Sequence, residues 1–421
     1  MSARPQKAER GSRHEGTVEK IVSGGAGLVR LERGAALVPR VAPGERIVLE
    51  EGRPFARLLK VLAPSTHRVA PACTYAARCG GCDLLHLDAE AQREARLSIL
   101  GEALTGIPTP PMVYRTASPE QRGRTRVRLH ARRVGREVMV GYHALGTQTI
   151  VPVEICLAID PRLEAAFLLA RQLLADATGT GEIQAALGHG EKPVLSIAWH
   201  GALPPSCFGV AERLVNEGRL AGVSLWLDGA REPARIGDPR PVSIDVHGAE
   251  LVAPVGGFAQ ASDVGDRVLV DRVVALARCD GLRVVELHAG SGNLTCALAR
   301  SAAHVTAVEL STAACTTLRE NIAARDLTAH VKVIEGDADR HELPGNVDVV
   351  VLDPPRTGAR GAVAELLRKR PRRVVYVSCD PATLGRDLRA LMGAYMVEAV
   401  EAVDLFPGTS HVETVVACVR S

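Results

Sequence analysis

Two residues near the end of the chain have the side-chain types that covalent catalysis needs. Cys379 follows an apolar run that ends at Ser378 and lies just before Pro381, so we expect its thiol at the exposed edge of a sheet, where it can act as a nucleophile. Glu413 precedes the last apolar run, and a carboxyl group whose pKa is raised by burial suits a general base. The residue types leave two ordinary alternatives open, an inert core cysteine and a surface carboxylate.

A glycine-rich turn predicts a nucleotide site. Gly290 and Gly292 come directly after an apolar run, in the segment Glu286–Asn293, and glycines let a backbone approach a nucleotide closely. Thr295 stands at the position of the third glycine of the dinucleotide fingerprint, so there is little case for pyrophosphate binding. The turn therefore favours a methyltransferase sheet that binds S-adenosylmethionine over a dehydrogenase.

Three carboxylates follow successive predicted strands. Glu309 ends a strand at the place where an acidic residue meets ribose hydroxyls, and Asp337 is placed to accept a hydrogen bond from an adenine amino group. Asp353 precedes two prolines that stiffen the backbone where a substrate base would meet the methyl donor. Glu309 and Asp337 each have the alternative of a helix cap or a surface charge. Arg356 stands where amino-methyltransferases have an aromatic residue, which weakens the case for an amine acceptor.

A compact group of cysteines predicts a metal site. Cys73, Cys79 and Cys82 follow a C-x5-C-x2-C spacing, and Cys156 is an isolated fourth. Four cysteines bind either zinc or an iron–sulfur cluster, and the spacing by itself slightly favours zinc. Ten cysteines in a chain without an apolar leader indicate reduced thiols, metal ligation or catalysis rather than a disulfide framework.

Arginines are concentrated between residues 115 and 136, where Glu120 is the only acidic residue. Their positive field suits RNA phosphates, although a merely solvated face is the alternative. Three of them alternate with Val127 and Leu129, as on the outer face of a strand. The eight arginines are Arg115, Arg122, Arg124, Arg126, Arg128, Arg132, Arg133 and Arg136.

The elements that must position these residues form an α/β pattern. From about residue 256 onward, apolar β-branched runs alternate with helical patterns, which predicts a Rossmann-like, mostly parallel sheet covered on both faces. The predicted strands are Arg283–Leu287, His304–Glu309, Val331–Ile334, Val347–Leu352, Arg373–Val377 and Val412–Val419.

The remainder divides into a flexible basic tail (1–15), a small β-barrel (16–62) and a central α+β domain (63–255), followed by the sheet domain (256–421). A helix is expected over Leu84–Leu104, and Trp199 and Trp226 are expected in the core. No stretch has the 18 or so apolar residues of a membrane span, and the N-terminus has no apolar signal region, so we expect a cytoplasmic protein without membrane contact. A net charge of +3 with 3% aromatic residues gives no general case for nucleic acid, which leaves that case to local clustering.

Two C-terminal signatures carry a family resemblance. Ser378–Leu384 with Arg386-Asp387, and Asp404–Pro407 with His411–Thr414, are similar to motifs of the RNA (uracil-C5) methyltransferases. The resemblance covers nearly the whole chain, since residues 16–62 are similar to the TRAM module, with Pro43–Glu45 in the expected place.

The resemblance implies a mechanism and ligands. Cys379 would add to uracil C6 and Glu413 would take the proton from C5. The four cysteines resemble the family's [4Fe–4S] ligands, which replaces the preference for zinc, and members with both TRAM and cluster are typically 23S rRNA enzymes. Asp353 and Gln260 would hold the donor and the uracil edge. The expected S-adenosylmethionine site comprises Gln260, His288, Gly290, Gly292, Asn293, Glu309, Asp337 and Asp353.

Three departures and three alternatives remain. Ser262 replaces the Asn of the family's Phe-x-Gln-x-Asn, and His288 and Ala289 replace an aromatic residue and a Cys. The alternatives are a tRNA substrate, whose branch generally lacks the cluster, methylation of another base or an exocyclic amine, and a non-catalytic iron–sulfur RNA-binding protein. The intact Gly290, Gly292 and Glu309 argue against the last. We expect a monomer that binds RNA.

Overall fold

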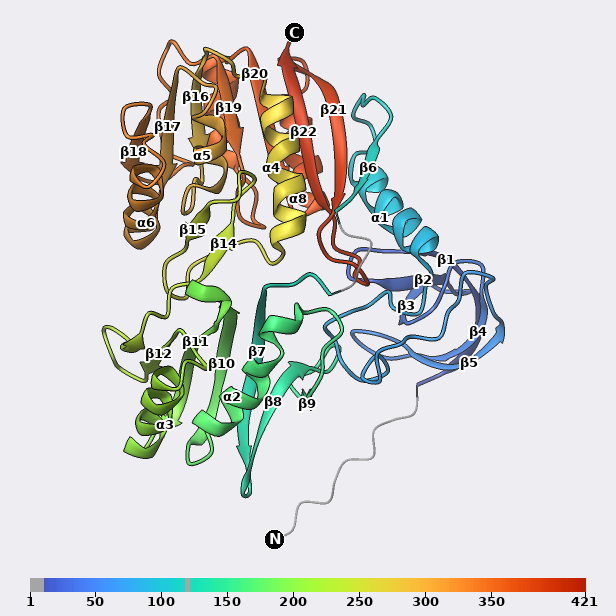
Figure 1. The fold of residues 1–421 in the computed structure, drawn as a ribbon. Coiled ribbons are helices and arrows are strands. Elements are labelled where there is room, and N and C mark those ends of the chain that lie inside the picture. Colours follow the sequence, from blue (N-terminus) through green and yellow to red (C-terminus); the bar gives the residue numbers. More distant parts are fainter. Residues whose placement is uncertain (1–10, 118–121) are drawn as a thin grey trace. The chain divides into compact units, whose positions relative to one another are not determined.

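The computed structural model describes residues 11–117 and 122–421, and its contacts divide the chain into two compact units (Figure 1). The first unit contains the chain up to Ile99 together with residues 143–148 and 408–411, and the second contains the rest. Residues 1–10 of the expected tail lie outside the described residues. Residues 13–15, also expected in the tail, belong instead to a strand.

The first unit is built on a five-stranded antiparallel sheet with the strand order β3-β2-β1-β4-β5. Its buried face includes Val18, Val38 and Ile47. Glu45 is buried and accepts hydrogen bonds from the backbone of Ala42 (2.8 Å) and from Arg68 (Nε, 2.5 Å), which ties the turn before β4 to the segment after the sheet. The strands are β1 (Arg13–Ile21), β2 (Ala26–Arg30), β3 (Ala35–Pro39), β4 (Arg46–Glu50) and β5 (Arg57–Ala63).

The cysteine loop, residues 64–88, follows this sheet and leads into helix α1 (Ala89–Ala103). The helix begins five residues later than its pattern predicts, because residues 84–88 form turns and Asp88 accepts a hydrogen bond from the backbone N–H of Ala91 (2.9 Å), as an N-cap residue does. Asp83 holds residues 408–411 by accepting hydrogen bonds from the N–H and hydroxyl of Ser410 (both 2.7 Å).

A seven-stranded sheet forms the first part of the second unit. Its order is β13-β12-β11-β10-β7-β8-β9; from β13 to β8 the neighbouring strands are antiparallel except β11 and β12, which are parallel. Trp199 is buried as expected, whereas Trp226 is 37% exposed. The strands are β7 (Arg126–Val134), β8 (Glu137–His143), β9 (Ile150–Pro152), β10 (Thr178–Leu187), β11 (Pro193–Ala202), β12 (Gly222–Leu227) and β13 (Ala234–Gly237); the helices are α2 (Ala165–Leu173) and α3 (Pro205–Asn216), with short 3-10 turns at Pro161–Leu163 and His189–Glu191.

A hairpin, β14 (Val242–Ile244) and β15 (Glu250–Val252), leads to the C-terminal sheet. This sheet has eight strands in the order β18-β17-β16-β19-β20-β22-β21-β6. β16 to β20 are parallel and β22 is antiparallel to both of its neighbours. Its strands are β16 (Arg283–Leu287), β17 (His304–Glu309), β18 (Val331–Glu335), β19 (Val349–Leu352), β20 (Arg373–Ser378), β21 (Tyr395–Asp404), β22 (Glu413–Arg420) and β6 (Val113–Thr116).

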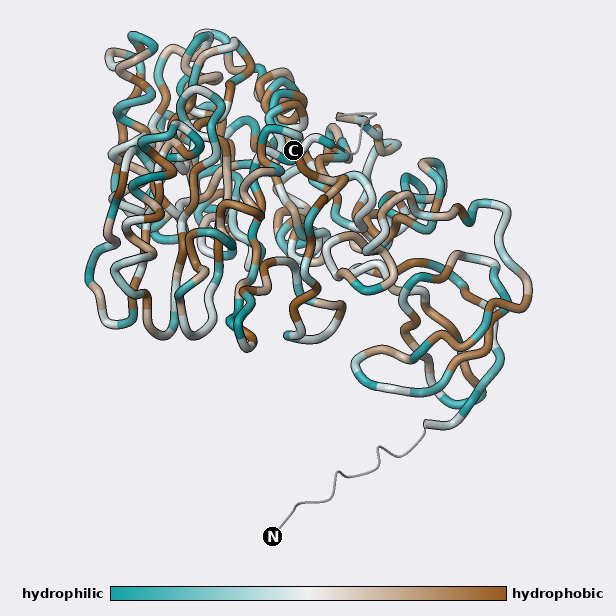
Figure 2. Tube along the Cα trace, turned by 60° about the horizontal axis from the view of Figure 1, so that its bottom comes forward, coloured by the Kyte–Doolittle hydropathy of each residue, from teal (hydrophilic) through white to brown (hydrophobic). Residues whose placement is uncertain are grey.

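Helices α4, α5 and α6 share one core with this sheet, which includes Val273, Leu298 and Leu318 together with Val351 and Val375. The strands of the sheet carry runs of hydrophobic residues (Figure 2), as expected for strands covered on both faces. In the part of the chain that the structure describes, no helix is long and apolar enough to cross a membrane. The helices are α4 (Asp263–Ala277), α5 (Asn293–Leu298), α6 (Thr312–Ala323), α7 (Arg360–Lys369) and α8 (Pro381–Leu391).

The α/β architecture with a Rossmann-like sheet is as the sequence predicts. The strand order turns back between β16 and β19, and ligands of such sheets bind at the carboxyl ends of the strands beside this switch point.

Candidate active site

The antiparallel last strand brings Cys379 and Glu413 together. Ser378 at the end of β20 pairs with Thr414 on β22. Cys379 is the next residue after Ser378 and Glu413 the residue before Thr414, so the two functional side chains are cross-strand neighbours at the carboxyl edge of the sheet. The Cys379 side chain is half-buried and Glu413 is only 5% exposed. A nucleophile and a carboxyl group predicted from separate motifs therefore share one place.

Burial sets the proton affinity of both groups. It raises the pKa of Cys379 to about 11, with the Glu413 carboxylate adding to the rise, whereas the positive charge of Arg356 and its hydrogen bond to the thiol lower it. Burial also raises the pKa of Glu413 to about 8, again with Arg356 acting in the opposite direction. Asp353, whose pKa burial raises to about 6, contributes to both shifts. Arg356 is thus the cation of this site, a role that the sequence analysis did not give it.

The turn that carries Arg356 is anchored by Asp387 of helix α8. Asp387 is buried and accepts hydrogen bonds from the hydroxyl of Tyr376 (2.7 Å) and the backbone N–H of Ala359 (2.9 Å). Arg386 donates to the carbonyl of Thr357 (3.0 Å). The signature pair Arg386-Asp387 therefore acts on the loop after Pro355 rather than on a ligand directly.

Cys379, the candidate nucleophile, lies between a strand and a helix. Asp380 caps α8 by accepting a hydrogen bond from the backbone N–H of Thr383 (2.9 Å), and Pro381 occupies the first turn. Both are standard helix-start residues. They place Cys379 just before the positive end of a helix, which favours the thiolate.

The glycine turn after β16 is open on its ligand side. A Cβ atom at Gly290 would meet no atom within 4 Å, whereas one at Gly292 would lie 2.2 Å from the Leu318 side chain. His288 has a φ of 62°, which is uncommon for a residue other than glycine. Among the described residues, Nε2 of His288 and Oδ1 of Asn293 are buried without a hydrogen-bond partner. Open backbone and unpaired buried polar atoms are what a polar ligand would satisfy.

Acidic residues surround this turn. Glu309 accepts hydrogen bonds from the backbone N–H groups of Gly290 (2.9 Å) and Ser311 (2.8 Å), so it both fixes the turn and ends β17 as predicted. Asp337 lies after β18 and accepts a hydrogen bond from the backbone of Asp339 (3.0 Å). Asp266 accepts a hydrogen bond from Asn293 (2.8 Å), and burial raises its pKa to about 7.

Glu286 and Asn321 also support the glycine turn, and the sequence by itself predicts a role for neither. Burial raises the pKa of Glu286 to about 8, and its carboxyl group accepts a hydrogen bond from the Thr295 hydroxyl. Asn321 of α6 donates to the carbonyl groups of Ser291 (2.9 Å) and Val252 (2.8 Å). The contact of Glu286 is local, nine residues along the chain, whereas Asn321 joins segments 30 and 69 residues away, which no local sequence pattern signals.

Gln260 lies on a short segment before α4. Thr125, just before strand β7 of the seven-stranded sheet, holds this segment. Thr125 donates its backbone N–H to the carbonyl of Ala261 (2.9 Å) and its hydroxyl to Asp263 (2.9 Å). Ser262 is buried and caps α4 through the backbone N–H of Gly265 (3.2 Å). The residue that replaces the family's Asn is thus a helix cap, which any of Ser, Thr, Asn or Asp provides.

The arginine-rich segment is not a uniform solvated face. Val127, Leu129 and Ala131 of β7 are buried and Arg128 and Arg132 are exposed, as the alternation predicts. Arg128 also forms an ion pair with Glu182 (3.3 Å), and several of the other arginines have partners within the protein. Arg115 and Arg122 pair with Glu401 and Glu164, Arg133 donates to the Gly135 and Ala175 carbonyls, Arg124 lies over the Phe406 ring, and Arg126 is largely buried.

The cysteines fall into two groups. Five are buried, whereas Cys73, Cys79, Cys82, Cys156 and the nucleophile candidate Cys379 are half-exposed. Over residues 11–117 and 122–421, no three His, Cys, Asp or Glu side chains are arranged to hold a metal ion. The structure therefore leaves the predicted metal site a prediction.

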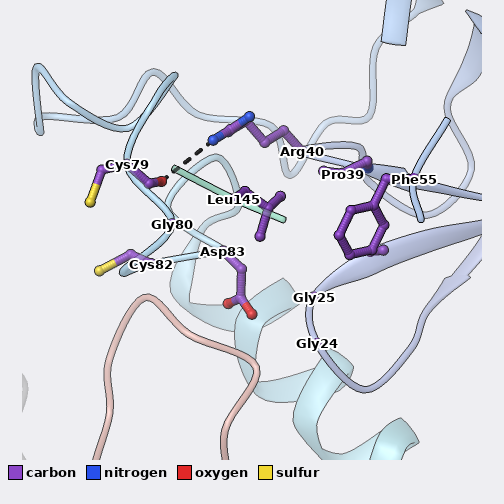
Figure 3. A pocket seen from close by; sticks show the side chains of 11 residues that line it. Gly24, Gly25, Pro39, Arg40, Phe55, Cys79, Gly80, Cys82, Asp83 and Leu145 are labelled. Atoms are coloured by element: carbon purple, nitrogen blue, oxygen red, sulfur yellow. Dashed lines mark hydrogen bonds between the residues drawn. The ribbon is translucent and has the colours of Figure 1, made fainter. Parts of the chain in front are cut away.

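The loop that bears Cys79 and Cys82 borders a small pocket against the first sheet (Figure 3). Arg40 donates to the backbone carbonyl groups of Ala76 (3.0 Å) and Cys79 (3.4 Å). The sulfur atoms of Cys79 and Cys82 point to the same side, away from Phe55. The backbone N–H of Gly81 donates to the Cys79 sulfur (3.3 Å), a type of contact that tunes iron–sulfur clusters.

A parallel sheet with a reversed last strand, a glycine turn at its switch point and a thiol beside a buried carboxyl group define an α/β methyltransferase. Two family models agree with this class. Residues 343–421 match the model described as tRNA (Uracil-5-)-methyltransferase, and residues 273–381 match conserved hypothetical protein 95. The first of these matches supports the expected methyl donor, S-adenosylmethionine.

Relatives of known name extend over nearly the whole chain. The 23S rRNA (uracil(1939)-C(5))-methyltransferase of Alkalilimnicola ehrlichii is 32% identical over 417 residues, which cover 93% of each chain. The enzyme of the same name from Thiobacillus denitrificans is 31% identical and covers 93% of this chain and 96% of its own. The crystal structure of Pyrococcus abyssi tRNA (uracil-54, C5)-methyltransferase with S-adenosyl-L-homocysteine has the same fold, with a TM-score of 0.76 over 96% of this chain at 20% identity. The chain belongs to the RNA (uracil-C5) methyltransferase family.

Proposed function

We propose that this enzyme forms 5-methyluridine in 23S rRNA, at the uridine that corresponds to position 1939 of its relatives' substrate. The carrying observation is the cross-strand pair of Cys379 and Glu413. A thiol and a buried base are what methylation of a pyrimidine carbon needs, whereas an amine acceptor has its own lone pair and needs no thiol. Relatives about 30% identical over more than 90% of the chain supply the substrate class.

The chemistry divides between the two residues. The Cys379 thiolate adds to uracil C6, a C–S bond forms, and the C5–C6 π electrons move into an enolate, which makes C5 nucleophilic. S-adenosylmethionine would supply an electrophilic methyl group to C5, with its methyl–sulfur bond breaking and S-adenosylhomocysteine leaving. Glu413 then removes the C5 proton, the C5–C6 double bond re-forms, and the C–S bond breaks to release the thiolate. A pKa of about 8 makes Glu413 a stronger base than an ordinary carboxylate.

The donor site follows from the open side of the glycine turn. Gly290 and Gly292 leave space for the donor, and the unpaired polar atoms of His288 and Asn293 would hydrogen-bond it. Glu309 would accept from the ribose hydroxyls and Asp337 from the adenine amino group. Asp353 and Gln260 would hold the reacting uracil and the donor beside Cys379.

Two variants and one substrate analogue test the covalent mechanism. Cys379→Ala should bind donor and RNA but give neither product nor covalent complex. Glu413→Gln should attack and then stall with RNA bonded to Cys379. RNA with 5-fluorouridine at the target should stall the wild type in the same way, because fluorine cannot leave C5 as a cation. The readout is a protein–RNA band that survives denaturant on a gel. Near wild-type methylation by Cys379→Ala, or no band with fluorinated RNA, would exclude the mechanism.

A tRNA substrate is the second candidate, which the family model over residues 343–421 favours. Mapping 5-methyluridine in ribosomal and transfer RNA, from cells with and without the gene, separates the two. Loss confined to 23S rRNA supports the proposal, and loss confined to tRNA contradicts it. A ribosomal substrate would place the enzyme in the cytoplasm, and we propose that it acts as a monomer.

We further propose that Cys73, Cys79, Cys82 and Cys156 bind a [4Fe–4S] cluster. Support comes from their exposure, which sets these thiols apart from the five buried ones, and from the N–H···S contact at Cys79. The cluster and the first sheet, which would act as a TRAM module, would contribute RNA-shaping contacts. The exposed Arg128 and Arg132 would contact RNA phosphates.

A further inference from the structure

Arg126 differs from the other arginines of its segment. The sequence places it with Arg128 on an outer face, yet its side chain is largely buried, and burial lowers its pKa to about 10. Its Nη2 donates to the backbone carbonyl of Gly257 and to Oε1 of Gln184 (3.1 Å). Its Nη1 is also buried and has no partner in the described ranges. Burying a guanidinium is costly, and an RNA phosphate would not require it.

The contacts of Arg126 belong to a larger set around one segment. Gly257 lies three residues before Gln260, and its own N–H is fixed by the carbonyl of Pro254 (2.9 Å). On the other side of Gln260, Thr125 bonds Ala261 and Asp263. Thr125, just before β7, and Arg126, its first residue, therefore hold the segment 257–263 on both sides of Gln260.

The same edge of β7 reaches a second catalytic segment. The guanidinium carbon of Arg124 lies 5.4 Å from the centre of the Phe406 ring, a cation–π distance. Phe406 follows Leu405, which packs in the core of the C-terminal sheet, and it precedes Glu413 by seven residues. The start of β7 thus contacts the chain on the way to the general base as well as the segment of Gln260.

From these contacts we infer that Arg126, with Thr125, is a positioning residue for Gln260. The seven-stranded sheet then has two roles along strand β7. The exposed Arg128 and Arg132 contact RNA, and the buried Arg126 holds the segment that presents Gln260 to the uracil. This inference rests on the proposed function. Misplacing a substrate-positioning group by about 1 Å costs on the order of 100-fold in rate.

The test separates positioning from phosphate binding. Arg126→Gln removes the charge and Arg126→Lys keeps it with one donor in place of a planar fork. We expect kcat with target RNA to fall by about 10- to 100-fold in Arg126→Gln, with KM for RNA and the salt dependence of RNA binding unchanged, and partial recovery in Arg126→Lys. Arg128→Gln is the contrast, since it should raise KM for RNA and flatten the salt dependence.

Thr125→Val provides a second, uncharged variant that removes only the hydrogen bond to Asp263, and it should also lower kcat. A rise of KM in Arg126→Gln, with a flattened salt dependence as in Arg128→Gln, would show a phosphate contact and overturn the inference. So would an unchanged kcat in folded Arg126→Lys and Thr125→Val, which decide the matter if Arg126→Gln does not fold. Failure of the wild type to methylate uridine would instead overturn the proposed function.

Discussion

At the scale of single residues, the positive charge of Arg356 acts against several carboxyl groups in the site. Arg356 opposes the rise in pKa of both Cys379 and Glu413, while Asp353 and burial increase it. A thiol with a pKa of about 11 is almost entirely protonated at pH 7. Nucleophilic attack therefore depends on the small thiolate fraction that Arg356 and the start of α8 sustain.

This balance predicts opposite effects for two substitutions on the alkylation of Cys379 by iodoacetamide. Alkylation requires the thiolate, so its rate rises with pH toward the pKa. Arg356→Gln should raise the pKa of Cys379. At pH 8, each increase of this pKa by one should slow alkylation about tenfold. Above pH 8, where Glu413 is mostly ionised, Glu413→Gln removes a negative neighbour, lowers the pKa of Cys379 and should speed alkylation. The measurement is the rate of modification of Cys379 by mass spectrometry between pH 7 and 10.

The control is Arg360→Gln, which removes an exposed arginine at the start of α7 and should leave the alkylation rate as in the wild type. Equal slowing by Arg356→Gln and Arg360→Gln would mean that net charge, and not the contact with Cys379, sets the reactivity. Slower alkylation in Glu413→Gln would mean that this carboxylate is not close to the thiol.

At the scale of elements, the glycine turn combines two different demands. Gly290 has a φ of 55° and open space beside it, whereas Gly292 has a φ of 92° and its Cα hydrogen faces Leu318 of α6. The first position leaves room for a ligand, and the second lets the turn pack on a helix.

Substituting each glycine by alanine should separate the two demands. Gly290→Ala should cost only about 1–2 kcal/mol of stability, the strain of a left-handed residue, but should weaken donor binding because the methyl group enters the open space. Gly292→Ala should lower the melting temperature further, since its Cβ would overlap the Leu318 side chain. Thermal unfolding without donor and calorimetric titration with S-adenosylmethionine measure the two effects. Equal donor affinity in Gly290→Ala and the wild type would place the donor elsewhere.

Local pattern predicts the strands of the sheet but not every member. The runs at Arg283–Leu287 and His304–Glu309 match β16 and β17 residue for residue, because a buried parallel strand has a continuous apolar sequence. β21 was not predicted, because Glu398 and Glu401 interrupt its apolar residues twice, whereas Glu286 interrupts those of β16 only once. Glu401 is tolerated because Arg115 (2.9 Å) and Arg272 (2.8 Å) pair with it, and partners so distant in the chain cannot be foreseen from a local pattern.

The same distinction applies to the candidate site. Cys379, Glu413 and Asp353 each end or begin an apolar strand, and such strand ends meet at one edge of a sheet, so the sequence is sufficient to group them. Arg126 was expected on a solvated face because alternation alone cannot tell a solvated position from one covered by another segment. What covers it is the stretch around Gly257, which lies 131 residues away in the chain.

At the scale of the whole molecule, the two compact units carry different tasks. The second unit contains every residue of the proposed reaction, together with the arginines that are proposed to position or contact the RNA. The first unit contains the five-stranded sheet and the loop of Cys73, Cys79 and Cys82. The cysteine loop has little regular structure of its own, so a bound cluster would supply order that hydrogen bonds and packing provide elsewhere.

A cluster in this loop predicts a distinct behaviour on removal of one ligand. Protein purified without oxygen should be brown and contain iron, with about four iron atoms per chain as a [4Fe–4S] cluster requires. Cys82→Ser should lose iron and colour. Because residue 82 is far in the chain from Cys379, the loss should appear as lower stability or RNA affinity. The matched control is Cys207→Ser, at a fully buried cysteine of α3, which should keep its iron whatever it does to stability.

Colourless wild-type protein with bound zinc would contradict the cluster, and full iron retention by Cys82→Ser would remove this cysteine from the ligand set. Donor binding should be unchanged in Cys82→Ser, since the glycine turn and its acids depend on contacts within the C-terminal sheet.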